Sequence, residues 1–454
     1  MNLKIVILAA GQGTRMKSKH PKVLHKVMGK AMLDHVIEEC KDLSDSKPVV
    51  VIGHMAEALK DHLKDSADTV IQKEQLGTGH AVMMAVSHIK DEEPVLILCA
   101  DTPLIKKETL CAMAELKAEG YSAVVMSSII ENPTGYGRII RDSEGDFLRI
   151  KEQKDADEDE LKIREINAGM YIIDGKSLKE NLQKLSSDNA QNEYYLTDVL
   201  EHIKKENKKI GVFVANENEI LGVNSRVQLA QAEMDMKKNI NTFHMENGVT
   251  IIDPHNTYID KEAVIGRDTI IYPNVRIIGK TIIGEDVTIR ENTTIENSKI
   301  EDNVVIKSST ITESVVGANS TIGPYAYLRP KSIIGSNVKI GDFVEVKNAV
   351  IGNGSKASHL SYIGDADVGK NVNIGCGVVF VNYDGKNKHR STVKDNAFIG
   401  SNCNVVAPVI IEEKAYIATG STVTIDIPKD SLCVARAREV IKEGWTSKKG
   451  ILSK

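Results

Sequence analysis

The sequence predicts two different folds in one chain: an α/β domain with a Rossmann-like sheet, followed by a linker helix and a parallel β-helix. Three observations predict this fold class. Apolar runs alternate with helical patterns in the first half, a polar stretch of helical spacing follows, and aliphatic residues then recur every six positions. The expected boundaries are 1–226 for the first domain, 227–247 for the linker helix and 248–454 for the second domain.

Composition limits the class of protein to which the chain can belong. Its 454 residues suffice for two or three domains, and a hydrophobic content of 41% allows each a core. A net charge of −5 argues against a general nucleic-acid-binding protein, and no apolar run approaches the length of a membrane span. The six cysteines are scattered without a CxxC pair, so we expect reduced thiols in a cytoplasmic protein.

The first predicted strand, 4–10, runs directly into the glycine loop Gly11-Gln12-Gly13-Thr14-Arg15. Such a loop lets backbone N–H groups approach phosphates closely. It lacks the third glycine of the dinucleotide fingerprint, and no Gly-Lys-Ser/Thr follows as in a Walker A loop. Arg15 and Lys22 can converge on a triphosphate, although Lys22 taken alone is as readily a solvated surface lysine.

Strands and helices continue to alternate beyond this loop, with predicted ranges 48–52, 55–63, 69–72, 81–89 and 95–98. The last of these is a continuous apolar run, which is typical of a buried parallel strand, and it leads into Asp101. A carboxylate just beyond the carboxyl end of a central strand lies where open α/β sheets bind ligands, and oxygen ligands suit Mg²⁺. The alternative for Asp101 is an ordinary turn or helix-capping residue.

A long helix is expected between the two domains. Apolar residues have helical spacing from Val227 to Phe243, and Gly248 is a plausible stop signal. Pro, Gly and Ser are almost absent between Gln228 and Glu246, so a purely flexible linker is disfavoured.

Aliphatic residues in the second half keep a period of six. One series runs from Ile259 to Ile295, a second from Val316 to Val346 and a third from Ile399 to Val423, with slips of phase between them. This period fits a hexapeptide solenoid, in which each repeat supplies a short strand and three repeats make one triangular coil. A β-sandwich is the alternative, but sandwiches do not hold one period for so long.

Polar residues collect where the six-residue pattern is interrupted. Arg329, Lys347 and His359 fall within a few coils, and the repeat then stops for the polar loop 381–390. A loop that leaves a solenoid is free to carry function. His359 alone would more often be an exposed turn histidine, so its interpretation depends on these neighbours.

The motifs of the first half resemble a sugar-nucleotide pyrophosphorylase domain: Leu8-Ala9-Ala10-Gly11 with Gly13-Thr14-Arg15-Met16, Pro21-Lys22, Gln72, Gly77-Thr78 and Asp101. With the hexapeptide region, essentially the whole chain resembles the family of bifunctional N-acetylglucosamine-1-phosphate uridyltransferases/glucosamine-1-phosphate N-acetyltransferases. The resemblance implies acetyl transfer from acetyl-CoA to glucosamine-1-phosphate. Uridylyl transfer from UTP to N-acetylglucosamine-1-phosphate would follow, supplying peptidoglycan precursors. It also implies a Rossmann-like nucleotidyltransferase domain, Mg²⁺, a left-handed β-helix and a homotrimer.

The same resemblance assigns residues to the uridyltransferase site. Its implied substrate contacts are Leu8, Ala9, Ala10, Gly11, Arg15, Lys22, Gln72, Gly77, Thr78, Gly137, Glu152, Asn167 and Asn224. Asp101 and Asn224 would be the metal ligands. Many relatives have tyrosine and glycine where this chain has Cys99 and Ala100, which leaves the packing beside the base or the sugar open.

For the acetyltransferase site, the resemblance makes His359 the general base that deprotonates the sugar amine. The implied glucosamine-1-phosphate contacts are Arg329, Lys347, Tyr362 and Asn373, and the implied acetyl-CoA contacts are Cys376, Asn382, Tyr383, Ser401, Thr419 and Arg436. Relatives often have alanine at the positions of Cys376 and Thr419. Cys376 as a covalent acyl carrier is a competing interpretation, and the basic tail beyond Arg436 either meets coenzyme A phosphates or is solvated.

Two other functions remain open at the level of the sequence. One is a single-function pyrophosphorylase whose repeats only regulate it, and the other is a scaffold subunit in which both sites are silent. The first leaves the combination of Arg329, Lys347 and His359 without a purpose, and the second also leaves Asp101 and Asn224 unexplained.

Overall fold

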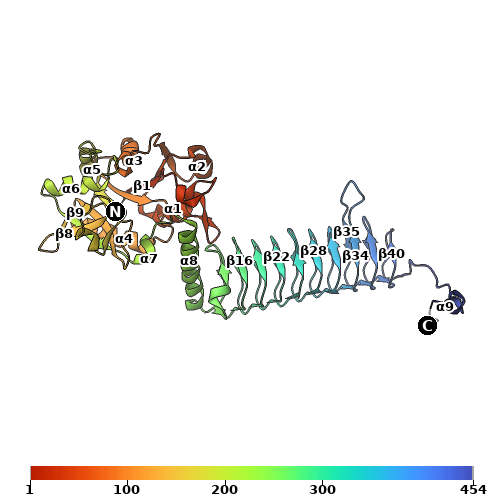
Figure 1. Ribbon diagram of the computed structural model, residues 1–454. Coiled ribbons are helices and arrows are strands. Elements are labelled where there is room, and N and C mark those ends of the chain that lie inside the picture. Colours follow the sequence, from red (N-terminus) through yellow and green to blue (C-terminus); the bar gives the residue numbers. More distant parts are fainter. Residues whose placement is uncertain (1, 452–454) are drawn as a thin grey trace. The chain divides into compact units, whose positions relative to one another are not determined.

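The computed structural model describes residues 2–451, which divide into two compact units between Met236 and Lys237 (Figure 1). No helix within these residues combines the length and the apolar character needed to cross a membrane. All six cysteines carry free thiols.

The first unit is built around a nine-stranded mixed sheet with the strand order β11-β7-β10-β6-β1-β4-β5. In addition, β8 pairs with β10, and β9 pairs with β8. The strands are β1 (Lys4–Ala9), β4 (Val49–Ile52), β5 (Asp68–Ile71), β6 (Pro94–Cys99), β7 (Ala123–Ile129), β8 (Arg138–Arg141), β9 (Phe147–Lys151), β10 (Glu165–Asp174) and β11 (Ile210–Val214). The central strands β6, β1, β4 and β5 run parallel, as in a Rossmann-like sheet, whereas β10 is antiparallel to both β6 and β7.

Helices cover both faces of this sheet, because alternate side chains of the central strands enter two separate cores. Ile5 and Ile7 of β1 belong to the core under α1 (Met32–Cys40), α2 (Ala56–Leu63) and α4 (Lys107–Ala118). Val6 belongs to the core under α3 (Thr78–Ala85), α5 (Gly175–Leu182) and α6 (Thr197–Lys205). A strand buried on both faces needs apolar residues at every position, which explains its continuous apolar run.

The helix α8 (Arg226–Glu246) contributes residues to both units, as does no other helix of the described residues. It follows the short helix α7 (Glu217–Ile220) in the chain. In the first unit, the Glu233 carboxylate of α8 accepts a hydrogen bond from the Met28 N–H at 2.7 Å. In the second unit, the buried Asn241 amide donates to the carbonyl oxygens of Pro254 and Thr257.

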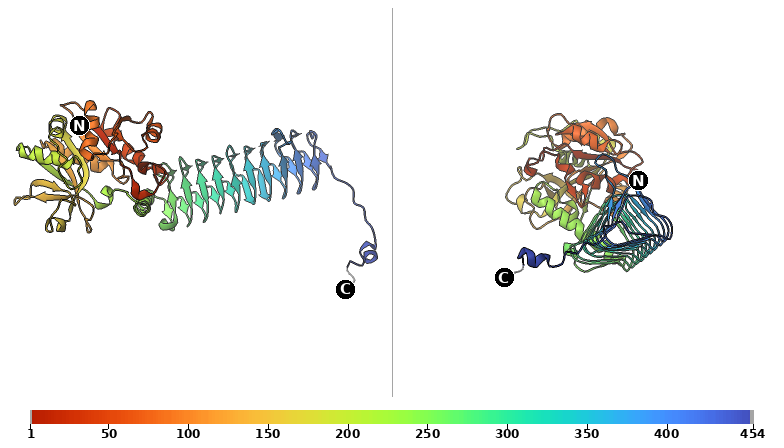
Figure 2. Two further views of the ribbon diagram at one scale, coloured as in Figure 1. Left: turned by 45° about the horizontal axis from the view of Figure 1, so that its top comes forward. Right: turned by 90° about the vertical axis from the view of Figure 1, so that its right-hand side faces the viewer.

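The second unit is a left-handed parallel β-helix of hexapeptide repeats whose three walls are parallel sheets of eleven, ten and nine short strands. They run from β12 (Thr250–Ile251) to β41 (Leu432–Cys433), from β13 (Tyr258–Ile259) to β40 (Thr422–Val423), and from β14 (Val264–Ile265) to β38 (Ile410–Ile411). Viewed end-on, the coils form a triangle (Figure 2). The periodic aliphatic residues point inward, and Leu328, Val346 and Ile363 stack in successive coils with no exposed surface.

The slips of phase in the sequence do not break this stack. Ile283 pairs with Ile300, and Ile295 pairs with Ile311, so these coils are shorter by one or two residues than a coil of three hexapeptides. The missing residues are taken out of the corners, while the strands stay in register. Corner residues often have positive φ, as at Asn292 and Asn337, a conformation that asparagine tolerates better than most residues.

The polar loop predicted after the second series does leave the stack. Ala366 pairs with Ser391, which lies 25 residues further along, because residues 382–390 project between β34 (Val379–Val381) and β35 (Ser391–Val393). The loop stands out from the coils beside β35 in Figure 1. Its far end is fixed by Arg390, whose guanidinium forms a bidentate ion pair with Asp367.

Two candidate active sites

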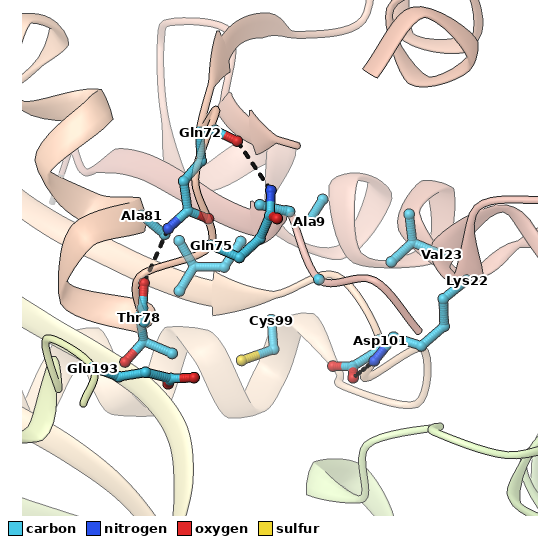
Figure 3. Close-up of a pocket in the computed structure, with 14 residues that line it drawn as sticks. Ala9, Lys22, Val23, Gln72, Gln75, Thr78, Ala81, Cys99, Asp101 and Glu193 are labelled. Carbon is cyan, nitrogen blue, oxygen red and sulfur yellow. Dashed lines mark hydrogen bonds and ion pairs between the residues drawn. The ribbon is translucent and has the colours of Figure 1, made fainter. Parts of the chain in front are cut away.

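The first candidate site is a cavity of about 280 Å³ at the carboxyl ends of the parallel strands in the first unit (Figure 3). The predicted residues that line it are Leu8, Ala9, Ala10, Gly11, Lys22, Gln72, Gly77, Thr78 and Asp101. They come from the ends of β1, β5 and β6, from the start of α3 and, for Lys22, from the short 3₁₀ helix Lys22–Leu24. The fold therefore gathers around one cavity residues that are dispersed between positions 8 and 101 of the sequence.

Gly77 begins the turn into α3 and cannot carry a side chain there. Its φ is 106°, and a Cβ would lie 2.7 Å from the carbonyl oxygen of Tyr194. The chain of residues 193–196 is held against this turn, since the Thr78 hydroxyl accepts the Leu196 N–H at 3.1 Å. The amino end of α3 thus lines the same cavity as Gly11 of the glycine loop, a place that favours phosphate binding. The Gly79 N–H is taken by the Tyr194 carbonyl oxygen at 2.8 Å.

Gln72 is buried, and its amide orientation follows from its neighbours. Its Nε2 group donates to the Gly77 carbonyl oxygen at 3.1 Å and lies 3.1 Å from His80 Nδ1. A carbonyl oxygen only accepts, so Nε2 must face Gly77. The Oε1 atom is then the group that this side chain can offer to a ligand in the cavity.

Lys22 and Asp101 line the cavity and meet Asn224, which is not among its lining residues. The Lys22 ammonium forms an ion pair with Asp101 Oδ2 and lies 3.0 Å from Asn224 Oδ1. The Val223 N–H donates to the Asp101 carbonyl oxygen at 2.8 Å, which ties the Asn224 segment to the end of β6. The two predicted metal ligands, Asp101 and Asn224, thus both contact the Lys22 ammonium. One carboxylate and one amide oxygen fit Mg²⁺, which takes few protein ligands and completes its shell with water and substrate phosphates.

The predicted sugar contacts form a group of their own beside the cavity. The Asn167 N–H donates to the Gly137 carbonyl oxygen at 2.9 Å, and a Cβ on Gly137 would lie 3.4 Å from a carboxylate oxygen of Glu152. Burial raises the pKa of the Glu152 carboxyl. Glu152 also lines a neighbouring cavity of about 200 Å³. Arg15 is exposed and is not among the residues that line either cavity.

Cys99, whose packing the sequence leaves open, lies in the wall of the first cavity together with Gln75 and Glu193. Its thiol is 3.4 Å from the carbonyl oxygen of Gly169, and burial raises its pKa to about 12. The thiol is therefore protonated near neutral pH and acts as a small apolar wall group. No sequence motif marks Gln75 or Glu193.

The second candidate site lies on the outer surface of the β-helix. Arg329, Glu345, Lys347 and Tyr362 come from three successive coils of the ten-stranded sheet, at β25 (Tyr327–Leu328), β28 (Glu345–Lys347) and β31 (Tyr362–Gly364). Arg329 Nη1 donates to Glu345 Oε1 at 2.7 Å.

Lys388 of the projecting loop joins this group, although no sequence motif marks it. Its contact with Lys347, together with burial and the charge of Arg329, holds the pKa of Lys347 below its ordinary value. Lys347 and Lys388, with Arg329 beside them in its pair with Glu345, concentrate positive charge that suits a phosphate. The sequence signal for Lys388 is the basic composition of residues 386–390. The six-residue period does not extend into the loop, so it cannot predict which of these residues lies beside Lys347.

The base of the loop is held by a buried polar cluster. Both carboxylate oxygens of Asp365 are occupied, one by the Asn348 amide and the other by the Asn382 amide. Asn382 Nδ2 is also 3.4 Å from the Tyr362 hydroxyl. The Tyr362 hydroxyl lies against the backbone at Gly364, where an added Cβ would be only 2.4 Å from it. Tyr383, by contrast, is exposed.

His359 and three of the predicted acetyl-CoA contacts form one column along a corner of the β-helix. His359 ends β30 (Lys356–His359), and Cys376, Ser401 and Thr419 occupy the equivalent position in the following coils. We call this set, with Asp342 one coil below, the corner column. Because stacked strands are 4.7–4.9 Å apart, the column spans about 14 Å from His359 to Thr419. Arg436 extends it, since its Cδ lies 3.7 Å from the Cβ position of Gly420.

The predicted residues of the second site do not all share one face. Asn373 lies on β33 (Asn373–Ile374) of the eleven-stranded sheet, whereas Tyr362 and Lys347 belong to the ten-stranded sheet. His359 stands at the corner between these walls, with Nδ1 2.7 Å from Asp342 Oδ1. Two other groups of this region that could serve as a base are engaged: Glu345 pairs with Arg329, and His389 Nε2 is 2.7 Å from Asp384.

Comparisons with known proteins match both units. Residues 5–163 match the MobA-like NTP transferase domain, 254–326 the GMPPB C-terminal domain and 313–348 the bacterial transferase hexapeptide (six repeats). A protein named bifunctional protein GlmU from Clostridioides difficile strain 630 is 59% identical over 451 residues, which cover 99% of this chain and 98% of that protein. Its namesakes from Alkaliphilus metalliredigens strain QYMF and Caldanaerobacter subterraneus subsp. tengcongensis are 54% and 52% identical, covering 99% and 98% of this chain and 99% and 97% of their own lengths.

Proposed function

The chain belongs to the bifunctional GlmU family, and on this premise we propose that its two units make UDP-N-acetylglucosamine in two steps. The second unit transfers the acetyl group of acetyl-CoA to glucosamine-1-phosphate. The first unit transfers the uridylyl group of UTP to N-acetylglucosamine-1-phosphate and releases pyrophosphate, and the product serves peptidoglycan synthesis. The observation that carries the proposal is that one chain holds two separate polar constellations, each suited to one of these reactions.

The uridylyl transfer requires one anion to attack another, so neutralising charge is the main task of the first site. Lys22, Arg15 and the N–H groups of the glycine loop would hold the triphosphate, and Gln72 Oε1 would accept from the base. When bound by Asp101 and Asn224, Mg²⁺ would supply further charge neutralisation at the α-phosphate. Gly137, Glu152 and Asn167 would orient the sugar, so that its phosphate oxygen attacks in line and no protein nucleophile is needed.

The acetyl transfer requires a free amine beside a thioester. Arg329, Lys347 and Lys388 would bind the sugar phosphate, and Tyr362 and Asn373 would bind the sugar. The proposal makes His359 the base that takes a proton from the C2 ammonium. The amine nitrogen then bonds to the acetyl carbon and the carbon–sulfur bond breaks. The imidazolium returns its proton to the leaving thiolate, and the acylated nitrogen releases its second proton to water to give the neutral amide. Direct transfer of this kind needs no acyl-cysteine, so Cys376 would serve as a wall of the acetyl-CoA site.

Acetyl-CoA would lie along the corner column. Ser401 and Thr419 follow His359 in successive coils, and Arg436 lies beyond them. This order suits an extended pantetheine arm whose thioester sits beside the base and whose phosphates meet the arginine. Asn382 and Tyr383, at the base of the loop, would contact the same substrate from the other side.

A homotrimer is the assembly that we propose. The outer surface of the nine-stranded sheet carries exposed aliphatic side chains in several coils, which marks an interaction surface: Val264, Ile282, Ile333, Val350 and Ile410. The position of Asn373 on another wall from Lys347 also favours a site completed by a second copy. Free thiols throughout, and the use of UTP and acetyl-CoA, favour the cytoplasm as the compartment.

One assay tests the two activities separately. Purified protein is given glucosamine-1-phosphate and acetyl-CoA, and free thiol is followed; it is then given N-acetylglucosamine-1-phosphate, UTP and Mg²⁺, and pyrophosphate is followed. We expect both products, each dependent on its own sugar phosphate. Pyrophosphate without thiol would identify a single-function pyrophosphorylase with a regulatory tail, and the absence of both would favour a scaffold.

A further inference from the structure

We propose that Asp342 is a positioning residue for acetyl transfer, holding His359 in the tautomer and orientation in which Nε2 can take the proton of the substrate ammonium. This inference rests on the proposed acetyltransferase function. It concerns a residue that no motif marks, which lies 17 positions before His359 and directly below it in the stack of coils. Asp342 and His359 are paired residues of β27 (Lys339–Asp342) and β30, and His359 Nδ1 is 2.7 Å from Asp342 Oδ1.

The tautomer follows from the chemistry of the two groups. The Asp342 backbone N–H and the His359 side chain hold the pKa of the Asp342 carboxyl below its usual range, so that carboxyl is ionised at neutral pH. An ionised carboxylate only accepts hydrogen bonds, so Nδ1 must carry the proton in the neutral imidazole. The lone pair then resides on Nε2, the nitrogen that Asp342 does not occupy. Once Nε2 has taken a proton, the carboxylate also stabilises the imidazolium.

A purely structural role for this contact is disfavoured by its exposure. The side chains of His359 and Asp342 are 57% and 38% exposed, and exposed ion pairs contribute little to stability. The aliphatic core beneath them, with Ile340 and Ala357 fully buried, holds the two coils together without their help. The contact adds little stability but fixes the direction of a titratable ring, which is what a carboxylate does beside a general-base histidine.

The groups around the pair support the same assignment. Lys339, on the same strand, acts on Asp342 through its charge, and Cys376 occupies the next coil above His359. Glu345 is engaged by Arg329, and Asp384 is engaged by His389, so neither is placed to orient His359. Asp342 is thus the carboxylate that the described hydrogen bonds connect to this imidazole.

The experiment compares Asp342→Ala, Asp342→Asn, His359→Ala and the double variant Asp342→Ala/His359→Ala in both assays. We expect Asp342→Ala to lower kcat for acetyl transfer by about 10- to 100-fold, the range found when the hydrogen-bond partner of a metal-ligating histidine is removed. The KM values and uridylyl transfer should stay near native. Asp342→Asn should lose at least as much, because its amide can donate to Nδ1 and favour the wrong tautomer. Glu413→Ala, which removes a surface contact with Lys429 elsewhere on the β-helix, is the matched control and should have no effect.

The double variant distinguishes positioning from an independent or structural effect. If Asp342 acts through His359, removing it from the His359→Ala protein changes nothing further. Multiplying losses, a rise in KM with unchanged kcat, or native kcat in Asp342→Ala would each overturn the inference. Absence of thiol release in the native protein would instead overturn the proposed acetyltransferase function, so the two failures are distinguishable.

Discussion

Replacing Gly364 by alanine should damage acetyl transfer selectively, because Tyr362 lies directly on the backbone of this glycine. An added Cβ would lie 2.4 Å from the Tyr362 hydroxyl oxygen and 2.6 Å from the ring carbon that carries it. Ordinary contact begins at about 3.4 Å, so the end of the ring must move by about 1 Å. A misplacement of about 1 Å can cost up to about 10²-fold in rate, and we expect a loss of that order in kcat/KM for glucosamine-1-phosphate.

The assay is thiol release by Gly364→Ala, with pyrophosphate release by the same protein as the control for folding of the other unit. Combining the change with Tyr362→Ala removes the ring that causes the clash. In the Tyr362→Ala background, Gly364→Ala should therefore lower the rate of acetyl transfer little further. The remaining effect would come from the Asn382 amide, which lies 2.8 Å from the added Cβ. Native acetyl transfer by the single variant would refute the reasoning, as would an equal loss of pyrophosphate release.

Four further predictions concern other parts of the molecule. Asp101→Ala should abolish pyrophosphate release and spare thiol release; loss of both by a folded protein would contradict the assignment of two sites. His359→Ala should lower acetyl transfer by about 10²–10⁴-fold with normal uridylyl transfer, and higher pH should partly restore it because free amine then forms without help. Lys388→Ala should raise KM for glucosamine-1-phosphate by about tenfold or more, the value of a charge-assisted hydrogen bond. Lys388 holds the pKa of Lys347 down, so Lys347 should lose its proton, and the native KM for glucosamine-1-phosphate should rise, at a lower pH than an ordinary lysine would give. In Lys388→Ala this rise should move to higher pH. Identical pH profiles of KM in the two proteins would exclude the coupling. Light scattering should give a trimer, and a stable, active monomer would argue against the proposed assembly.

The sequence predicts the elements of this molecule well where a period or a strand end determines them. The period of six places the inward aliphatic residues, and the end of β1 places the glycine loop, because both follow from local geometry. The pairing of residues in different coils could not be predicted. A corner can lose a residue without disturbing the core, so coils differ in length, as the pairs Ile295–Ile311 and Ile340–Ala357 show.

This uncertainty of register explains which site residues the sequence missed. Asp342 is recognised as the neighbour of His359 only when the length of that particular coil is known. Lys388 belongs to a loop outside the repeat, whose path is set by the Arg390–Asp367 ion pair and the buried Asp365 cluster. Neither interaction has a periodic signature, because each joins residues that are distant in sequence through side chains that the core pattern does not constrain.

The corner column gives the order of residues along the chain a chemical meaning. Each coil adds one position about 4.8 Å further along the corner, so Asp342, His359, Ser401 and Thr419 are met in the same order in sequence and in space. If acetyl-CoA lies along this column with its thioester beside His359, the distance of a residue from the reacting carbonyl rises with its number from His359 onward. Substitutions at Asp342 and His359 should then act on kcat, whereas Thr419 and Arg436, nearer the phosphates, should act on KM for acetyl-CoA. A loss of kcat at Thr419 with unchanged KM for acetyl-CoA would place the thioester near Thr419 and not beside His359. His359 would then be too far from the reacting amine to act as its base.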